Sequence, residues 1–149
     1  MKKYLLIIAT LLPLYGGTYT YGVVDYTYIN LVKMLHSEAD GEIYAGKIAI
    51  CAVAVNIAKC NKIPLKDVVV NSKLFHGIGT PKYYETPSSD SYRAAYVILS
   101  GKVKPFPDNV VYYYNPKTYK NKVWVNKIKK YRYIKVGNHI FCYDPQFKK

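Results

Sequence analysis

The stretch from Ile48 to Val55 constrains the fold more than any other part of this chain. Every residue in it is apolar, and it lies inside a helical segment predicted from Ile43 to Lys59. A helix with apolar side chains on every side cannot face water, so other elements must surround it. The chain has 149 residues, which is enough for one domain but not for two. We therefore predict one domain built around this helix.

Helical patterns flank the predicted central helix on both sides. Apolar spacing, a proline at a helix start, a serine cap and a glycine after a helix end predict three further helices, over residues 25–37, 65–70 and 88–99. The segment 74–87 contains two glycines and two prolines, so we predict a long loop there.

The pattern changes after Pro107. Four short runs rich in β-branched and aromatic residues follow, at residues 110–114, 123–125, 131–136 and 139–143. Gly137-Asn138 separates the last two runs and is typical of a hairpin turn. Helices followed by short antiparallel strands in one small domain predict the α+β class.

The first residues resemble an export signal. Lys2-Lys3 precede an apolar run over residues 4–12, and Pro13 and Gly16-Gly17 follow. We interpret residues 1–17 as a signal peptide, or as an N-terminal anchor if it is not cleaved, and residues 23–149 as the functional domain. A buried first helix is the alternative. The expected location is secreted or in the cell envelope.

The cysteine pattern predicts neither a disulfide framework nor a metal site. Three cysteines are too few for a framework in an exported chain, and Cys51 and Cys60 lie too far apart along one helix to pair. A bond between Cys60 and Cys142 stays open, and Cys51 is interpreted as a small core residue. The Cys and His spacing matches no zinc motif, so we expect no metal.

The charge of the chain indicates an anionic partner. Lys and Arg number 22 against 9 Asp and Glu, which gives a net charge of +13. Nucleic acid, acidic lipid and an anionic cell wall all fit that charge. The sequence has no arginine-rich tract, RNA-binding motif or basic amphipathic helix, so we expect no nucleic acid and no lipid-surface role.

The junction between the first two helices is the best candidate for chemistry. Of the three glutamates, Glu38 and Glu42 lie in the phrase Ser37-Glu38-Ala39-Asp40-Gly41-Glu42. A carboxyl group that ends a helix against an apolar wall has its charged form disfavoured, which suits a general acid. The alternative is a solvated loop carboxylate, with Glu42 favourably placed in the first turn of the next helix.

Five motifs in order resemble a known family, the cell wall hydrolases of SleB/CwlJ type, which are the spore-cortex lytic enzymes and their relatives. The motifs are Ser37-Glu38-Ala39-x-Gly41-Glu42; Gly46-Lys47-x-Ala49 with Asn56; Ser91-Tyr92-Arg93-Ala94-Ala95; Tyr112-Tyr113-Tyr114-Asn115-Pro116; and Gly137-Asn138-His139-x-Phe141. The order holds from about residue 31 to residue 143. The loop around Phe75 matches the family's aromatic-plus-serine segment only loosely.

The resemblance implies a small lysozyme-like domain that cleaves peptidoglycan glycan strands without a cofactor or metal. Glu38 is the implied catalytic acid of a lytic transglycosylase acting between N-acetylmuramic acid and N-acetylglucosamine. A monomer bound to glycan strands, and to the anionic wall through its basic surface, is expected. The predicted substrate-binding residues, taken from these motifs and from the aromatic side chains, are Glu42, Phe75, Tyr112, Tyr113, Asn115, Trp124 and His139.

Aromatic side chains suit a sugar groove because their faces stack on pyranose rings. Strand alternation places Tyr112 and Tyr114 on one face and Tyr113 on the other, so we do not expect all three to line one groove. Asn115 is a candidate for an acetamido group, although it also fits an ordinary turn. Two alternatives stay open: a muramidase-type hydrolase with a second carboxylate, and a non-catalytic wall-binding module.

Overall fold

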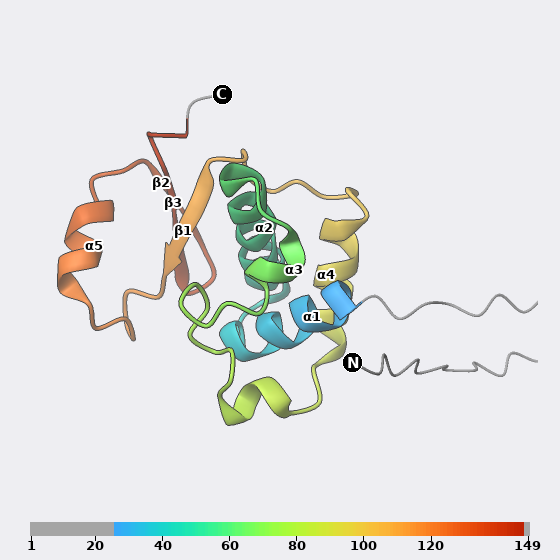
Figure 1. The fold of residues 1–149 in the computed structure, drawn as a ribbon. Coiled ribbons are helices and arrows are strands. Elements are labelled where there is room, and N and C mark those ends of the chain that lie inside the picture. Colours follow the sequence, from blue (N-terminus) through green and yellow to red (C-terminus); the bar gives the residue numbers. More distant parts are fainter. Residues whose placement is uncertain (1–25, 148–149) are drawn as a thin grey trace, which may run out of the picture.

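Helix α2 (Tyr44–Asn61) lies at the centre of the fold, as the sequence predicts (Figure 1). The computed structural model describes residues 26–147, and the predicted export segment, residues 1–17, lies outside the described residues. Ile50, Cys51 and Val53 of α2 are completely buried. The apolar stretch is therefore the middle of the core, and the predicted α+β class is confirmed.

The other predicted helices are also present. They are α1 (Tyr26–Glu38), α3 (Leu65–Val68) and α4 (Ser89–Leu99), and α1 and α4 pack against α2. The Ser88 side chain accepts a hydrogen bond from the backbone N–H of Ser91, which confirms the predicted cap of α4. Helix α3 is shorter than predicted, and the predicted loop contains the 3₁₀ helix η1 (Pro81–Tyr84).

A three-stranded antiparallel sheet follows the helices. Its strands are β1 (Val110–Tyr114), β2 (Tyr133–Val136) and β3 (His139–Tyr143), in the order β1-β3-β2. Gly137 has a φ of +57° in the turn between β2 and β3, where the sequence predicts a hairpin. Because β3 lies in the middle of the sheet, β1 is an edge strand, and it packs against α2.

The prediction of a strand over residues 123–125 is wrong, because this segment forms helix α5 (Lys122–Ile128). The Asn121 side chain caps the helix by accepting a hydrogen bond from the backbone N–H of Trp124. Trp124, Val125 and Ile128 then pack into a second apolar cluster on the sheet. Tertiary packing thus outweighs the β propensity of the Val-Trp-Val sequence.

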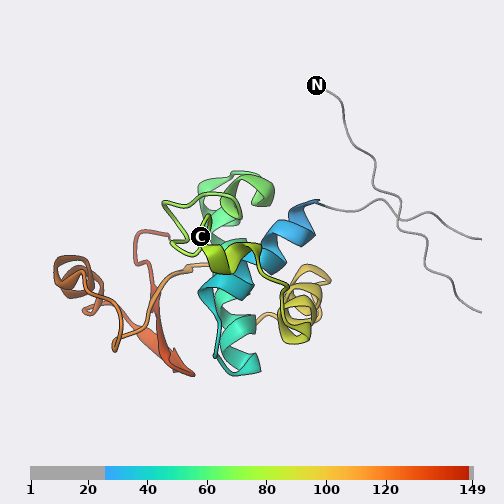
Figure 2. The ribbon, with the colours of Figure 1, turned by 90° about the horizontal axis from the view of Figure 1, so that it is seen from below.

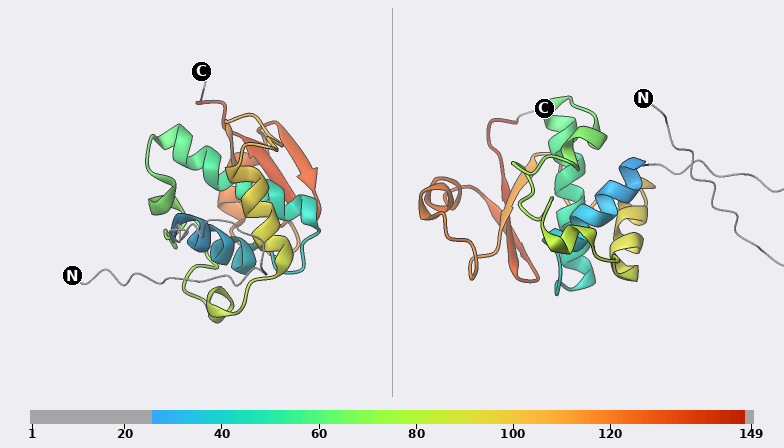
Figure 3. Two further views of the ribbon diagram at one scale, coloured as in Figure 1. Left: turned by 90° about the vertical axis from the view of Figure 1, so that its right-hand side faces the viewer. Right: turned by 60° about the horizontal axis from the view of Figure 1, so that its bottom comes forward.

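Helices α2 and α5 lie on opposite sides of the sheet. Figure 2 and the right-hand view of Figure 3 show the sheet between α5 and the bundle of α1, α2 and α4. Tyr113 and Phe141 belong to the core with α2, whereas Tyr114 and Cys142 pack in the second cluster with Trp124. Each face of the sheet is therefore covered by a different helix.

The three cysteines are free in the described part of the chain, so the open pairing of Cys60 with Cys142 is not formed. The Cys60 thiol donates instead to the carbonyl oxygen of Asp108. Burial raises the pKa of Cys142 to about 11 and raises that of Cys51 as well, which keeps both as thiols. Within residues 26–147, every helix is too short or too polar to span a bilayer.

Asn56 connects α2 to the start of the sheet. Its buried Nδ2 donates to the carbonyl oxygens of Pro107 (2.9 Å) and Val110 (3.0 Å). We expect Asn56→Ala to lower the free energy of unfolding by about 2–3 kcal/mol, because it removes both bonds to buried carbonyls. Urea unfolding measures the change. Asn61→Ala, at an exposed position of the same helix, should change it by less than about 0.5 kcal/mol. Equal losses would contradict the connecting role of Asn56.

Candidate active site

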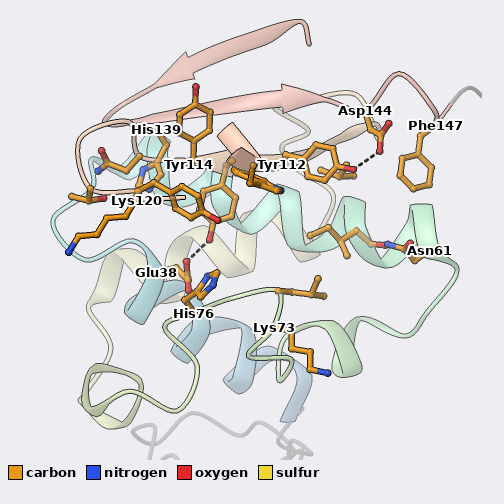
Figure 4. Close-up of a pocket in the computed structure, with 18 of the residues that line it drawn as sticks. Glu38, Asn61, Lys73, His76, Tyr112, Tyr114, Lys120, His139, Asp144 and Phe147 are labelled. Atoms are coloured by element: carbon orange, nitrogen blue, oxygen red, sulfur yellow. Dashed lines mark hydrogen bonds between the residues drawn. The ribbon is translucent and has the colours of Figure 1, made fainter. Parts of the chain in front are cut away.

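A cavity of about 800 Å³ opens between the helical half of the molecule and the free edge of the sheet (Figure 4). Six parts of the chain line it: the C-terminal end of α1, the C-terminal part of α2, the loop after α3, strand β1 with the connection that follows it, the start of β3, and the segment after β3. Its size and mixed lining are typical of a ligand-binding cleft.

Glu38, the last residue of α1, lies in this cavity with both carboxylate oxygens held. Oε1 accepts a hydrogen bond from the backbone N–H of Gly77, and Oε2 accepts one from the Tyr113 hydroxyl at 2.6 Å. Burial, together with the negative charge of Glu38, raises the pKa of Tyr113 well above its usual range. The phenol therefore keeps its proton and remains available to Glu38.

Helix α1 ends at Glu38 for a local reason. Lys47, which is buried, donates through Nζ to the carbonyl oxygen of Ala39 at 2.7 Å, at the negative end of the helix dipole. Gly41 then has a φ of +74°, which turns the chain away before α2 begins. The Lys47 hydrogen bond and the turn at Gly41 together position the chain directly after Glu38.

Gly77 approaches Ser37 so closely that no side chain fits between them. A Cβ atom at Gly77 would lie 2.5 Å from Ser37 Oγ and 3.0 Å from its backbone carbonyl carbon. Only glycine allows the loop to reach Glu38 and donate its N–H there. The prediction from the sequence did not include Gly77, although the Gly-x-Gly pattern of the loop was visible.

Phe75 lies behind the site rather than in it. Its side chain is completely buried, and its ring stacks against Tyr113 at a centroid distance of 6.4 Å. Phe141 stacks on Tyr113 as well, at 5.8 Å. The predicted substrate contact of Phe75 is therefore not supported, since this side chain positions the tyrosine that contacts Glu38.

Glu42 is also separated from the cavity, although it lies four residues after Glu38. Its carboxylate accepts a hydrogen bond from the backbone N–H of Asn138 at 3.2 Å, and His139 Nδ1 lies 3.1 Å from its other oxygen. A Cβ atom at Gly46 would lie 2.8 Å from that carboxylate. Glu42 is buried between α2 and the β2–β3 hairpin, so its predicted contact with substrate is not supported either.

The other predicted residues do line the cavity: Tyr112, Tyr113, Asn115, Trp124 and His139. Burial outweighs the attraction of nearby carboxylates and lowers the pKa of His139, so this imidazole is neutral near pH 7. Its ring meets Tyr113 edge-on at 5.5 Å. The structure thus brings Glu38 together with five of the seven predicted binding residues.

The expectation that the three tyrosines of β1 cannot share one groove is wrong. Alternation holds, since Tyr112 and Tyr114 contact Trp124 whereas Tyr113 stacks on Phe141. All three nevertheless line the cavity. The reason is that β1 is an edge strand, so a cavity at that edge receives side chains from both faces.

Asp144 was not predicted from the sequence, and it lies in the cavity at the far end from Glu38 (Figure 4). Its carboxylate accepts hydrogen bonds from the Tyr112 hydroxyl at 2.7 Å and from the backbone N–H of Gln146 at 2.8 Å. Burial and this carboxylate raise the pKa of Tyr112 to about 12. The only signal in the sequence was a carboxylate directly after the last predicted strand.

Lys73, His76 and Lys120 also line the cavity and were not predicted. They lie in loops without a recognisable motif, so the sequence alone gave no reason to select them. Among residues 26–147, no three His, Cys, Asp or Glu side chains lie close enough together to hold a metal ion.

The fold agrees with the comparisons to known proteins. The family model described as Cell Wall Hydrolase matches residues 41–142, and the chain belongs to this family. This confirms the resemblance found in the sequence motifs. Glu38 lies just before the matched segment, so its role depends on the geometry described above.

Two curated relatives are spore cortex-lytic enzymes, from Bacillus cereus and from Halalkalibacterium halodurans. Each is 28% identical to this chain over 116 residues and matches 75% of it. The chain spans well under half the length of these relatives, 42% and 33% respectively.

Two solved structures have the same fold. The catalytic domain of the germination-specific lytic transglycosylase SleB from Bacillus anthracis has a TM-score of 0.64 at 27% identity, with 80% of this chain and 96% of that domain covered. The catalytic domain of SleB from Bacillus cereus has a TM-score of 0.64 at 28% identity, with 85% and 99% covered.

Proposed function

We propose that this protein is an exported, monomeric lytic transglycosylase that cleaves peptidoglycan glycan strands between N-acetylmuramic acid and N-acetylglucosamine. The observation that carries the proposal is the position of Glu38, whose carboxyl group faces an aromatic cavity and is held at both oxygens. The likeness to two SleB catalytic domains supports it. Residues 1–17 supply the export signal or a membrane anchor.

Glu38 carries out both proton transfers. Its protonated form donates to the glycosidic oxygen while an oxocarbenium-like centre develops at C1 of the muramyl residue. The resulting carboxylate accepts the proton of the muramyl C6 hydroxyl, whose oxygen bonds to C1 and closes an anhydro ring. The C1–O bond breaks, the C6–O–C1 bond forms, and water does not enter the product.

Tyr113 and Gly77 can hydrogen-bond to Glu38 in both its protonated and its charged form. The Tyr113 hydroxyl donates to Glu38 when the carboxylate is charged and can accept from it when the carboxylic acid is neutral. The N–H of Gly77 is a fixed donor to the other oxygen and stabilises the charge that appears after the first transfer. The two groups hold the carboxyl in one orientation through both steps.

One working carboxylate fits the cavity better than two. Glu42 is buried behind the hairpin, and Asp144 lies at the other end, where Tyr112 and Gln146 occupy its oxygens. A hydrolase of either stereochemical type needs a second carboxylate at a set distance across the reacting sugar. Asp144 is the residue to test for the muramidase alternative, because it is the other carboxylate in the cavity lining.

The remaining predicted residues bind the glycan. Tyr112 and Trp124 offer aromatic surfaces for pyranose rings, and Asn115 lies beside them for an acetamido group. His139, neutral near pH 7, lines the wall next to Tyr113. The net charge of +13 holds the enzyme on the anionic cell wall.

Incubation of the protein with purified sacculi distinguishes a peptidoglycan-cleaving enzyme from a non-catalytic wall-binding module. We expect the wild-type protein to release soluble, sugar-containing fragments and to clear a peptidoglycan-containing gel after electrophoresis. The experiment is repeated with sacculi of several wall types. If the protein sediments with all of them but releases no fragments from any, the result would support the wall-binding module instead.

A further inference from the structure

The connection between β1 and β2 carries an unusual concentration of positive charge. Residues 115–132 contain six lysines and one arginine and have no aspartate or glutamate. Thr118, Tyr119, Lys120 and Trp124 of this connection form one wall of the cavity. The basic segment therefore borders the same site that holds Glu38.

Two lysines of the cavity lie on opposite sides of Glu38, Lys120 on the basic connection and Lys73 on the loop after α3 (Figure 4). Both are exposed, and neither is within ion-pair distance of a carboxylate in the part of the chain that the structure describes. The carboxylates of the lining, Glu38 and Asp144, already accept hydrogen bonds from hydroxyl and N–H groups. The two ammonium groups are thus available for an anionic ligand.

A glycan strand without peptides presents only the lactyl carboxylate of each muramyl residue, which lies close to the sugar ring and does not reach out to the walls of the cavity. In peptidoglycan, the muramyl residues carry stem peptides on their lactyl groups, and these stems have free carboxylates. Muramyl residues occur at every second sugar, so a strand bound across Glu38 places stems on both sides of the cleaved bond. Phosphate-bearing wall polymers are not attached to each of these sugars and do not match this placement.

We propose that Lys73 and Lys120 bind stem-peptide carboxylates on the two sides of the cleaved bond, so that the site selects peptide-bearing over bare glycan strands. The inference rests on the proposed function and specifies its substrate. Exposed ion pairs are individually weak, so each lysine is expected to contribute about two- to fivefold in affinity. Together they should give a preference of about tenfold.

Binding is measured with Glu38→Gln as the parent, so that the strands stay intact. Trp124 is the single tryptophan of the chain and lines the cavity, so its fluorescence reports on occupancy. Dissociation constants are compared for three strands of equal length: peptide-bearing, enzymatically freed of peptides with the exposed lactyl carboxyls amidated, and peptide-bearing with amidated carboxyls. We expect the first strand to bind about tenfold more tightly than the other two.

The variants use the same three strands. Lys73→Gln combined with Lys120→Gln should reduce the preference to about twofold, and 0.5 M salt should reduce that of the parent similarly. Lys66→Gln, at an exposed position of α3 outside the cavity lining, removes one charge and should keep the preference.

Three results would overturn the inference: a preference that survives in the double variant, one that Lys66→Gln removes as well, or one that persists with amidated stems. Failure of the proposed function is recognised separately. In that case the wild-type protein releases no sugar fragments from either strand, whereas the binding ratio still decides whether the two lysines recognise stem carboxylates.

Discussion

Replacing Glu38 by glutamine is expected to lower turnover on peptidoglycan at least about a hundredfold, the lower limit of the usual contribution of a general acid. The amide has nearly the same shape and still accepts the Gly77 hydrogen bond, but it has no proton to give to the glycosidic oxygen. The rate of release of soluble fragments from sacculi measures the loss. The unfolding midpoint should stay close to that of the wild type.

Glu42→Gln is the matched control, because it makes the same chemical change four residues away. Its carbonyl oxygen can still accept from Asn138, and its amide group can donate to His139 Nδ1, since that imidazole is neutral. We expect a loss of less than about tenfold. Comparable losses in the two variants would contradict the assignment of Glu38 as the single essential carboxylate.

Gly77→Ala is expected to lower kcat by about tenfold or more while the protein still folds. The added methyl group would lie 2.5 Å from Ser37 Oγ and 2.8 Å from its Cβ, so the loop has to move away from α1. The movement takes the Gly77 N–H away from Glu38, which then has only Tyr113 as a partner. Steady-state kinetics on soluble glycan strands measures the effect.

Gly101→Ala controls for the general effect of replacing a loop glycine. Gly101 has a φ of +70° with open space around it, so the change strains the backbone but displaces nothing at the cavity. It should lower the unfolding midpoint without lowering kcat. If Gly77→Ala also leaves kcat unchanged, the loop does not position Glu38.

The sequence predicted the helical half of the fold well because its signals are local. The apolar run inside α2, the cap at Ser88 and the turn at Gly137 each act within one element. The helix α5 was missed for the opposite reason. Its Val-Trp-Val sequence favours a strand, and only the packing of Trp124 against the sheet explains the helix.

The residues of the candidate site show the same contrast between local sequence signals and long-range contacts. Glu38 was predicted because it ends a helix next to a buried one, and the motifs around it resemble a family. Gly77 and Asp144 were missed, and Tyr113 was predicted only as a binding residue, because all three act through contacts with residues far away in the chain, such as that of Tyr113 with Glu38. Glu42 shows the converse, since its closeness in sequence to Glu38 suggested a shared site but the turn at Gly41 separates the two.

The chemical form of the released sugar ends tests the central proposal most directly. If Glu38 acts alone, the C6 hydroxyl attacks C1, and mass spectrometry of the products should show anhydromuramic acid ends. These ends are lighter than hydrolysed ends by one water and resist borohydride reduction. Mainly reducible muramic acid ends would contradict the account, because they require a water positioned by a second carboxylate, with Asp144 as the first residue to replace.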